Sequence, residues 1–191
     1  MKASSQIWAI VGVIGVIILI FGGIILLDNS KGDVSAGGLK VGEEAPEFKV
    51  KDYSGKTISS LDYSGKNLLL YFNEGVGCAP CWQQIVQLQK DQEKFKVLNT
   101  EIVTVGVDRT DLWKPIVEAN KVELAILIDT DRKMSRDYKA LDLASSMHAG
   151  NKPGHTFVLI GSDKKIKWVG DYPDMRVTNE QILDKIKIAL S

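Results

Sequence analysis

The chain has 191 residues, of which 45% are hydrophobic and 25% are charged, as in a globular protein large enough to bury a core. Its 24 basic residues balance its 24 acidic residues, and only Lys2 precedes the apolar segment near the N-terminus, which leaves 23 basic residues after it. A net charge this close to zero produces no strong field, so we expect no nucleic-acid partner.

Residues 7–27, IWAIVGVIGVIILIFGGIILL, form a run of 21 residues without a charge. As a helix this run would span about 30 Å, which is the hydrocarbon thickness of a bilayer. We therefore predict one N-terminal transmembrane helix that binds the lipid bilayer through residues 7–27, preceded by a short segment at residues 1–6. Removal of the run as a signal peptide stays open, because Val-Ser-Ala at 34–36 has the small residues of a cleavage site.

The charges beside this apolar run predict its orientation. Lys2 precedes the run, whereas Asp28 and Asp33 follow it alongside Lys31. The positive-inside rule then places the N-terminus in the cytoplasm and the rest of the chain outside the cell membrane. Residues 28–40 are polar and rich in Gly and Ser, which predicts a flexible linker. The folded domain would occupy residues 41–191.

Apolar runs and helical patterns alternate along this domain. Two similar stretches, DYSGK at 52–56 and at 62–66, predict turns on either side of a short strand in a small N-terminal hairpin. The buried strands that we predict next are 67–72, 101–107, 124–128, 156–160 and 166–169. One predicted helix follows Cys78, with an apolar stripe of Ile85, Leu88, Phe95 and Leu98. The other predicted helices occupy 111–121, 134–141 and 178–190. This order predicts an α/β fold in which helices cover both faces of a parallel sheet, made mixed by the closing hairpin.

The only cysteines, Cys78 and Cys81, stand in the sequence Cys-Ala-Pro-Cys between a predicted strand and a predicted helix. The helix N-terminus favours a thiolate at Cys78, and the thiolate is the form that attacks disulfides. Cys81 lies one turn later, where it is less exposed and can resolve the mixed disulfide. Pro80 falls in the first helical turn and stiffens it. Trp82 is placed to shield the buried sulfur and, like Pro80, is expected beside the substrate.

Two other interpretations of the cysteine pair are weaker. An inert disulfide closing so short a loop would restrict the unfolded chain little, so it would add little stability. A closed zinc site needs more ligands, and the chain offers no second Cys-x-x-Cys and only His148 and His155. We therefore predict redox chemistry with no metal and no cofactor.

Four stretches resemble a known superfamily in their order and spacing. They read VGEEAPEF (41–48), LLLYFN (68–73), VTVGVD (103–108) and HTFVLIGSDKKIKWVG (155–170). Over residues 41–191 the chain resembles the thioredoxin-fold redoxins, which include peroxiredoxins of the alkyl hydroperoxide reductase/thiol-specific antioxidant type and membrane-tethered thioredoxins. This resemblance implies a thioredoxin-like fold and an oxidoreductase.

The residues with which peroxiredoxins bind peroxide are missing. That group carries P-x-x-x-T/S-x-x-C, and here Cys81 takes the place of the attacking cysteine while Cys78 replaces the hydroxyl residue. Glu74 replaces the proline, and the family's arginine falls at Gly154. Taking Cys78 as the attacking residue improves neither match, so the resemblance favours a dithiol.

The loop that faces the cysteines in thioredoxins also differs. The family's cis-proline falls at Gly154, with Pro153 one residue early, so either the loop shifts or the glycine lets a substrate backbone approach closely. His155 is a candidate to stabilise the thiolate or move protons, or else is a partly exposed loop histidine without a role. Glu74 is a candidate proton acceptor near Cys81, although we favour a solvated carboxylate.

These observations predict a membrane-anchored, extracytoplasmic thiol–disulfide oxidoreductase with Cys78 as nucleophile and Cys81 as resolving thiol. Its partners would be proteins with disulfides or thiols, and a membrane or extracytoplasmic electron donor would reset the pair. One alternative is a peroxiredoxin-like antioxidant peroxidase using the same cysteines. Another is a Sco-like copper-binding assembly factor, since Cu(I) suits two thiolates and His155 could complete the site.

Overall fold

The computed structural model describes residues 38–191. The predicted segment 1–6, the predicted transmembrane helix 7–27 and all but the last three residues of the predicted linker 28–40 lie outside the described residues. Within residues 38–191, no helix is both long enough and apolar enough to cross a bilayer.

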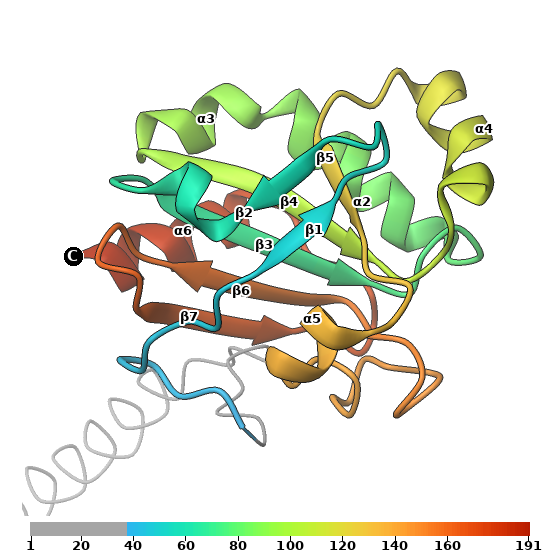
Figure 1. Ribbon diagram of the computed structural model, residues 1–191. Coiled ribbons are helices and arrows are strands. Elements are labelled where there is room, and N and C mark those ends of the chain that lie inside the picture. The colour runs from blue at the N-terminus through green and yellow to red at the C-terminus, as the bar shows by residue number, and fades with distance from the viewer. Residues whose placement is uncertain (1–37) are drawn as a thin grey trace, which may run out of the picture. The chain divides into compact units, whose positions relative to one another are not determined.

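A five-stranded sheet forms the centre of the molecule, in the order β5-β4-β3-β6-β7 (Figure 1). The strands are β3 (Asn67–Asn73), β4 (Thr100–Gly106), β5 (Ala125–Ile128), β6 (Thr156–Ile160) and β7 (Ile166–Asp171). The pairs β3–β4 and β4–β5 are parallel, whereas β3–β6 and β6–β7 are antiparallel. The predicted mixed sheet is therefore confirmed, and β3 lies in its middle with all seven residues buried.

A small antiparallel hairpin precedes the sheet, as the two DYSGK stretches predicted. Its strands are β1 (Lys49–Lys51) and β2 (Thr57–Ser59), followed by the 3-10 helix η1 (Ser60–Tyr63). In the first turn, the Asp52 carboxylate accepts the backbone N–H of Lys56 at 2.9 Å, which closes the hairpin.

Five α-helices follow: α2 (Ala79–Lys90), α3 (Gln92–Val97), α4 (Thr110–Asn120), α5 (Lys133–Asp137) and α6 (Asn179–Leu190). Two of the predicted boundaries were wrong. The helix after Cys78 breaks at Asp91, whose backbone leaves helical geometry while its carboxylate accepts a hydrogen bond from Asn179 on α6. The predicted helix 134–141 ends at Asp137, because Lys139 adopts a left-handed φ of 51° that stops it.

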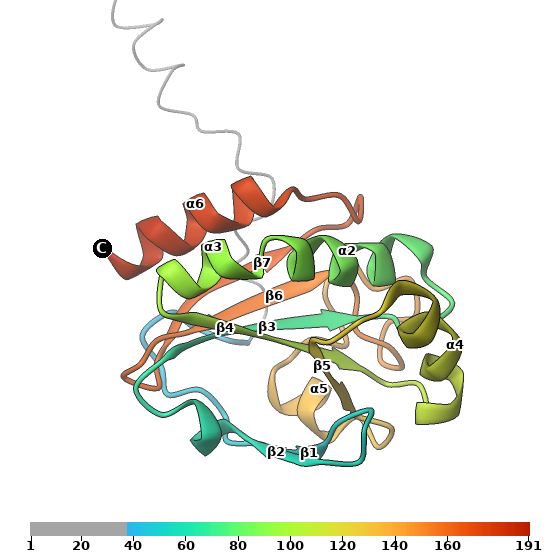
Figure 2. The same cartoon turned by 90° about the horizontal axis from the view of Figure 1, so that it is seen from above.

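Alternate residues of β3 point to opposite faces of the sheet and build two cores. Leu69 and Tyr71 face a core covered by α2, α3 and α6, to which Trp113 of α4 contributes. Leu70 and Phe72 face a second core covered by α5 and the β1–β2 hairpin. Figure 2 shows these two layers on either side of the sheet. Helices thus lie on both faces, but on the second face a hairpin supplies much of the cover.

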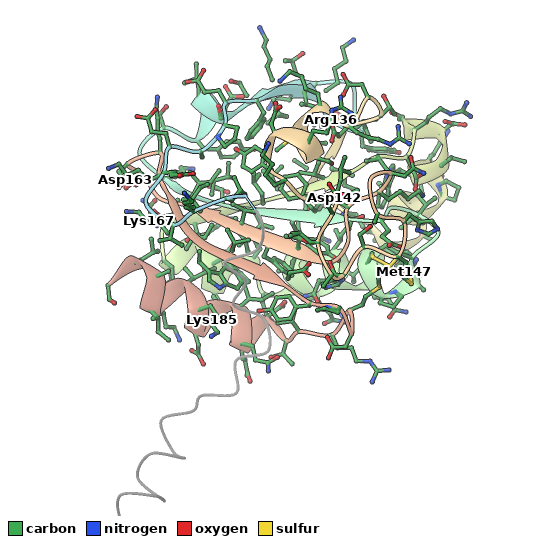
Figure 3. All side chains as sticks on the ribbon, turned by 90° about the horizontal axis from the view of Figure 1, so that it is seen from below. Arg136, Asp142, Met147, Asp163, Lys167 and Lys185 are labelled. Atoms are coloured by element: carbon green, nitrogen blue, oxygen red, sulfur yellow. A yellow bond between two sulfur atoms is a disulfide. The ribbon has the colours of Figure 1, made fainter. Side chains whose placement is uncertain are left out.

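The carboxyl end of β3 is the place in this fold where functional residues can come together. In parallel sheets, loops that follow the carboxyl ends of strands meet at one edge. Here the loop from β3 to α2 meets the long segment 138–155, which connects α5 to β6. Figure 3 shows Met147 of that segment at this end of the molecule, opposite Asp163 and Lys167 near the β6–β7 turn.

Candidate active site

Cys78 is the N-cap residue of α2, the position that precedes the first helical turn. Its sulfur accepts the backbone N–H of Cys81 at 3.3 Å. A helix N-terminus offers unpaired N–H groups and the positive end of the helix dipole, and both stabilise an anion. The sulfur of Cys78 is therefore held where a thiolate is favoured.

Cys78 and Cys81 form a disulfide, with their Cα atoms 5.2 Å apart. Cys78 keeps 6% of its surface exposed, whereas Cys81 has none. A thiolate arriving from solvent therefore meets Cys78 first. Pro80 is exposed in the first turn and has no N–H to offer, and Trp82 is half-buried against the core that α2 covers.

The loop between β3 and Cys78 is held tightly by hydrogen bonds. The Asn73 side chain donates to the carbonyl of Val105 at 3.1 Å and accepts the N–H of Gly75 at 3.0 Å. Asp108 accepts the N–H of Val76 at 2.8 Å. Gly75 has a φ of 97°, and a Cβ there would overlap the Asp108 carboxylate, so this position requires glycine.

Glu74 is 4% exposed, so the expectation of a solvated carboxylate was wrong. Its Oε1 accepts the N–H of Met147 at 2.7 Å and lies 3.6 Å from Nδ1 of His148. Its carbonyl accepts the ammonium of Lys152, which also pairs with Asp108 at 3.2 Å. Glu74 therefore joins the cysteine loop to the segment 138–155, and its predicted part as a proton acceptor stays a prediction.

His155 is fully buried, so a partly exposed loop histidine is excluded. Its Nδ1 lies 2.8 Å from the hydroxyl of Tyr71, and this hydroxyl also donates to the carbonyl of Cys81 at 3.3 Å. Within residues 38–191, neither ring nitrogen hydrogen-bonds a cysteine sulfur. The ring reaches the pair through Tyr71, a residue that the sequence analysis missed because it reads as one more apolar position of a buried strand.

Burial controls the charge of both rings. Desolvation lowers the pKa of His155 to about 4, although Asp174 partly opposes the shift, and desolvation raises the pKa of Tyr71 well above 10. At neutral pH the imidazole is uncharged and the phenol is protonated. Neither ring therefore brings a charge to the cysteine pair.

Pro153 and Gly154 are both buried, and residues 38–191 contain no cis peptide bond. A Cβ on Gly154 would overlap Oγ of Ser145 and the backbone of Ser145 and Ser146. The close approach that this glycine permits is therefore made by the chain itself. The predicted contact of the two residues with a substrate stays a prediction.

A buried carboxylate holds this region together. Asp171, at the end of β7, accepts the N–H of Ser145 at 3.0 Å, the hydroxyl of Ser145 and the hydroxyl of Thr156 at 2.8 Å. Ser145 Oγ in turn accepts the N–H of His155 at 2.7 Å. The segment 138–155 is thereby fixed to the sheet beside the cysteines.

Met175, in the loop between β7 and α6, was not predicted from the sequence. Its Sδ lies 3.6 Å from the sulfur of Cys78. The signal available in the sequence was weak, since the two residues are 97 positions apart and a single methionine has no characteristic spacing.

No observation favours the copper-binding alternative. Within the described residues, no three His, Cys, Asp or Glu side chains are placed to hold a metal ion. The His155 ring, which that alternative requires, is engaged with Tyr71.

A mixed sheet whose central strand leads to a disulfide at the start of a helix defines a redox protein of the thioredoxin-fold class. The profile of the AhpC/TSA family matches residues 41–169. The chain belongs to this family, as the resemblance implied.

Curated relatives of two kinds, both oxidoreductases, match this chain. The thiol-disulfide oxidoreductase ResA of Bacillus thuringiensis subsp. konkukian (strain 97-27) is 30% identical over 109 residues, which are 56% of this chain and 62% of the relative. The chain thus spans less than two thirds of the length of these relatives. Peroxiredoxin Bcp of Escherichia coli (strain K12) is 24% identical over 142 residues, 74% of this chain and 90% of the relative.

Solved structures confirm the thioredoxin-like fold. Mycobacterium tuberculosis AhpC superposes with a TM-score of 0.70 at 15% identity, covering 81% of this chain and 95% of the other. The thioredoxin domain of a thiol-disulfide oxidoreductase from Bacteroides vulgatus gives a TM-score of 0.61 at 20% identity, covering 81% of this chain and all of the other. At these identities the likeness concerns the fold alone.

The packing at Gly154 predicts the outcome of a pair of substitutions. Gly154→Ala should lower the free energy of unfolding by about 2–3 kcal/mol, because the new methyl group overlaps backbone that cannot move aside cheaply. Gly77→Ala is the matched control, since a Cβ there meets nothing within 4 Å. It should change stability by less than about 0.5 kcal/mol. Urea unfolding measures both, and equal effects would contradict the packing described.

Buried, neutral His155 predicts a dependence of stability on pH. The unfolded chain binds a proton at this residue near pH 6.5, whereas the folded chain resists protonation down to about pH 4. As the pH falls through this window, the folded state should lose about 3 kcal/mol that is fully present above pH 6.5. His155→Gln should lack this loss, so the two stability profiles converge towards acid pH. Parallel profiles between pH 7 and pH 4 would show that His155 titrates normally.

Proposed function

We propose that this chain is a membrane-anchored, extracytoplasmic thiol–disulfide oxidoreductase. The single observation that carries the proposal is the position of Cys78 at the N-cap of α2, bonded to a fully buried Cys81. This arrangement gives the two sulfurs different tasks. The relatives named thiol-disulfide oxidoreductase ResA support the same chemistry.

The reduced pair would act in two steps. The Cys78 thiolate attacks a disulfide of a protein substrate, forming a mixed disulfide and releasing one substrate thiolate. Cys81 then attacks the sulfur of Cys78, which forms the internal disulfide and releases the second substrate thiolate. Two electrons pass to the substrate, and a donor dithiol returns them by the reverse sequence.

The helix start acts in the first step and in its reverse. The N–H of Cys81 supports negative charge on Cys78 when Cys78 attacks the substrate disulfide, and again when Cys78 leaves the mixed disulfide formed with the donor. Neutral His155 leaves this charge to the helix, because the uncharged ring brings no positive charge and its nitrogens face the Tyr71 hydroxyl instead of a cysteine sulfur. The thiolate of Cys78 is thus stabilised by the backbone more than by a titrating side chain.

The location rests on the sequence alone. The uncharged run 7–27 is long enough to span a bilayer, and the charges around it favour a cytoplasmic N-terminus. A disulfide also persists better outside the cytoplasm. The substrates would accordingly be extracytoplasmic proteins, and the electron donor would lie in or outside the membrane.

A peroxidase using the same cysteines is the second candidate, favoured by the match to peroxiredoxin Bcp over 142 residues. The buried Gly154 stands where peroxiredoxins carry their arginine, which weighs against it. Stopped-flow mixing of the reduced protein with hydrogen peroxide separates the two. A thiol consumed no faster than free cysteine would exclude the peroxidase.

Single cysteine substitutions test the proposed order of attack. Cys81→Ser should accumulate a mixed disulfide between Cys78 and a model disulfide protein such as insulin, because no second thiol resolves it. Cys78→Ser should form no such adduct at neutral pH, since the remaining thiol is buried. Non-reducing gels and intact mass measure the adduct. Equal adduct formation by both variants would refute the assignment of Cys78 as nucleophile.

A further inference from the structure

Met175 lies against the sulfur that the proposed mechanism uses. Its Sδ is 3.6 Å from Sγ of Cys78, and because Cys78 carries no proton in the disulfide, this is a packing contact. Cys78 is left only 6% exposed. The Met175 side chain therefore covers part of the surface through which a thiolate must approach.

The backbone of Met175 is fixed in this position. Its φ is 53°, in the left-handed region, and its N–H donates to the carbonyl of Tyr172 at 2.8 Å. The next N–H, of Arg176, donates to the side chain of Asp174. The turn between β7 and α6 thus holds the Cα of Met175 beside the start of α2.

The far end of the same loop is tied to α2, the helix that Cys78 caps. Asn179, the first residue of α6, accepts the amide of Gln84 at 3.2 Å. Its own amide donates to the carbonyl of Gln87 at 2.7 Å and to Asp91 at 2.8 Å. Because both elements are anchored, the freedom that remains at Cys78 lies in the unbranched, flexible side chain of Met175.

An open groove runs along α2 beside this side chain. Pro80, Gln83 and Gln87 of α2 form one wall, and Met175 and Gln181 belong to the other. Amide side chains and Arg176 line the groove together with apolar groups such as Pro80 and Val177, and this mixed surface suits an extended polypeptide more than a small apolar ligand.

We propose that Met175 is a specificity-determining residue that gates Cys78, an inference that rests on the proposed dithiol function. The side chain obstructs small thiols, whereas a protein dithiol displaces it by occupying the groove along α2. Met175 acts on access to the sulfur and takes no part in bond formation.

The gated step is an ordinary exchange. A donor thiolate forms a bond to Sγ of Cys78, and the bond to Cys81 breaks with its electron pair on Cys81, which then takes up a proton. The second thiol of the donor, as thiolate, attacks the donor sulfur of the mixed disulfide and releases Cys78. The donor dithiol is oxidised by two electrons and the cysteine pair is reduced.

The test measures reduction of the Cys78–Cys81 disulfide in the full-length chain in detergent, with dithiothreitol or with a reduced thioredoxin as donor. Met175→Gly suits the left-handed backbone and removes the cover. The variant should raise the rate at which dithiothreitol reduces the disulfide at least tenfold. It should change the rate of reduction by thioredoxin less than threefold. Met175→Leu restores an apolar cover without sulfur and should stay within twofold of the native rates.

Two comparisons keep this result specific. Met147→Gly removes an exposed methionine at the same end of the molecule and should leave both rates unchanged. Met175→Asn, which also tolerates a left-handed φ, repeats the test should the glycine variant fold poorly. The equilibrium midpoint in dithiol–disulfide buffers should not shift, because a gate slows both directions equally.

The outcomes separate the gate from the underlying function. The gate would be overturned if Met175→Gly and Met175→Asn both react with dithiothreitol within twofold of the native rate. It would also be overturned if a Met175 variant speeds reduction by both donors equally, or if Met147→Gly speeds reduction by dithiothreitol as much as Met175→Gly does. These results would leave the dithiol function intact. A native disulfide that neither donor reduces would contradict the proposed function itself.

Discussion

One contact organises this molecule: the backbone N–H of Cys81 points at the sulfur of Cys78, because Cys78 caps the helix that contains Cys81. The contact exists only if the helix begins at that residue. The buried strand β3 ends five residues earlier and aims the chain there, and Pro80 suits the first turn, where an N–H has no helical partner. The helix then places Cys81 in the interior, so that Cys78 is the sulfur that solvent-borne groups reach and Cys81 is the buried resolving sulfur.

Much of the surrounding structure serves to hold this helix start in place without adding charge to it. His155 is neutral and Tyr71 is protonated, and together they reach only the backbone of Cys81. Lys152 pairs with Asp108 at 3.2 Å, and the Glu74 carboxylate accepts an N–H from the segment 138–155. The redox behaviour of Cys78 is thereby left to the helix end, to burial and to the cover provided by Met175.

The features predicted from the sequence are those that local pattern controls. Buried strands are continuous apolar runs, and a cysteine after such a run, followed by Ala-Pro-Cys, marks a helix start; these signals yielded the sheet, its mixed character and the place of the cysteines. The features that were missed depend on contacts between distant segments. Asp91, where the helix breaks, bonds Asn179 across 88 residues, the burial of Glu74 depends on a loop 73 residues later, and Met175 meets Cys78 across 97 residues. No local spacing signals such contacts.

The proposed mechanism requires the two sulfurs to differ in acidity and access, and titration of the two thiols tests this difference most directly. The pH dependence of iodoacetamide alkylation of the reduced protein, with each thiol located by mass spectrometry, gives the pKa of both. We expect the pKa of Cys78 to lie below about 8.5, the value of an ordinary thiol, and Cys81 to react only at higher pH. Two thiols that both titrate near about 8.5 at equal rates would contradict the claim that the start of α2 activates Cys78.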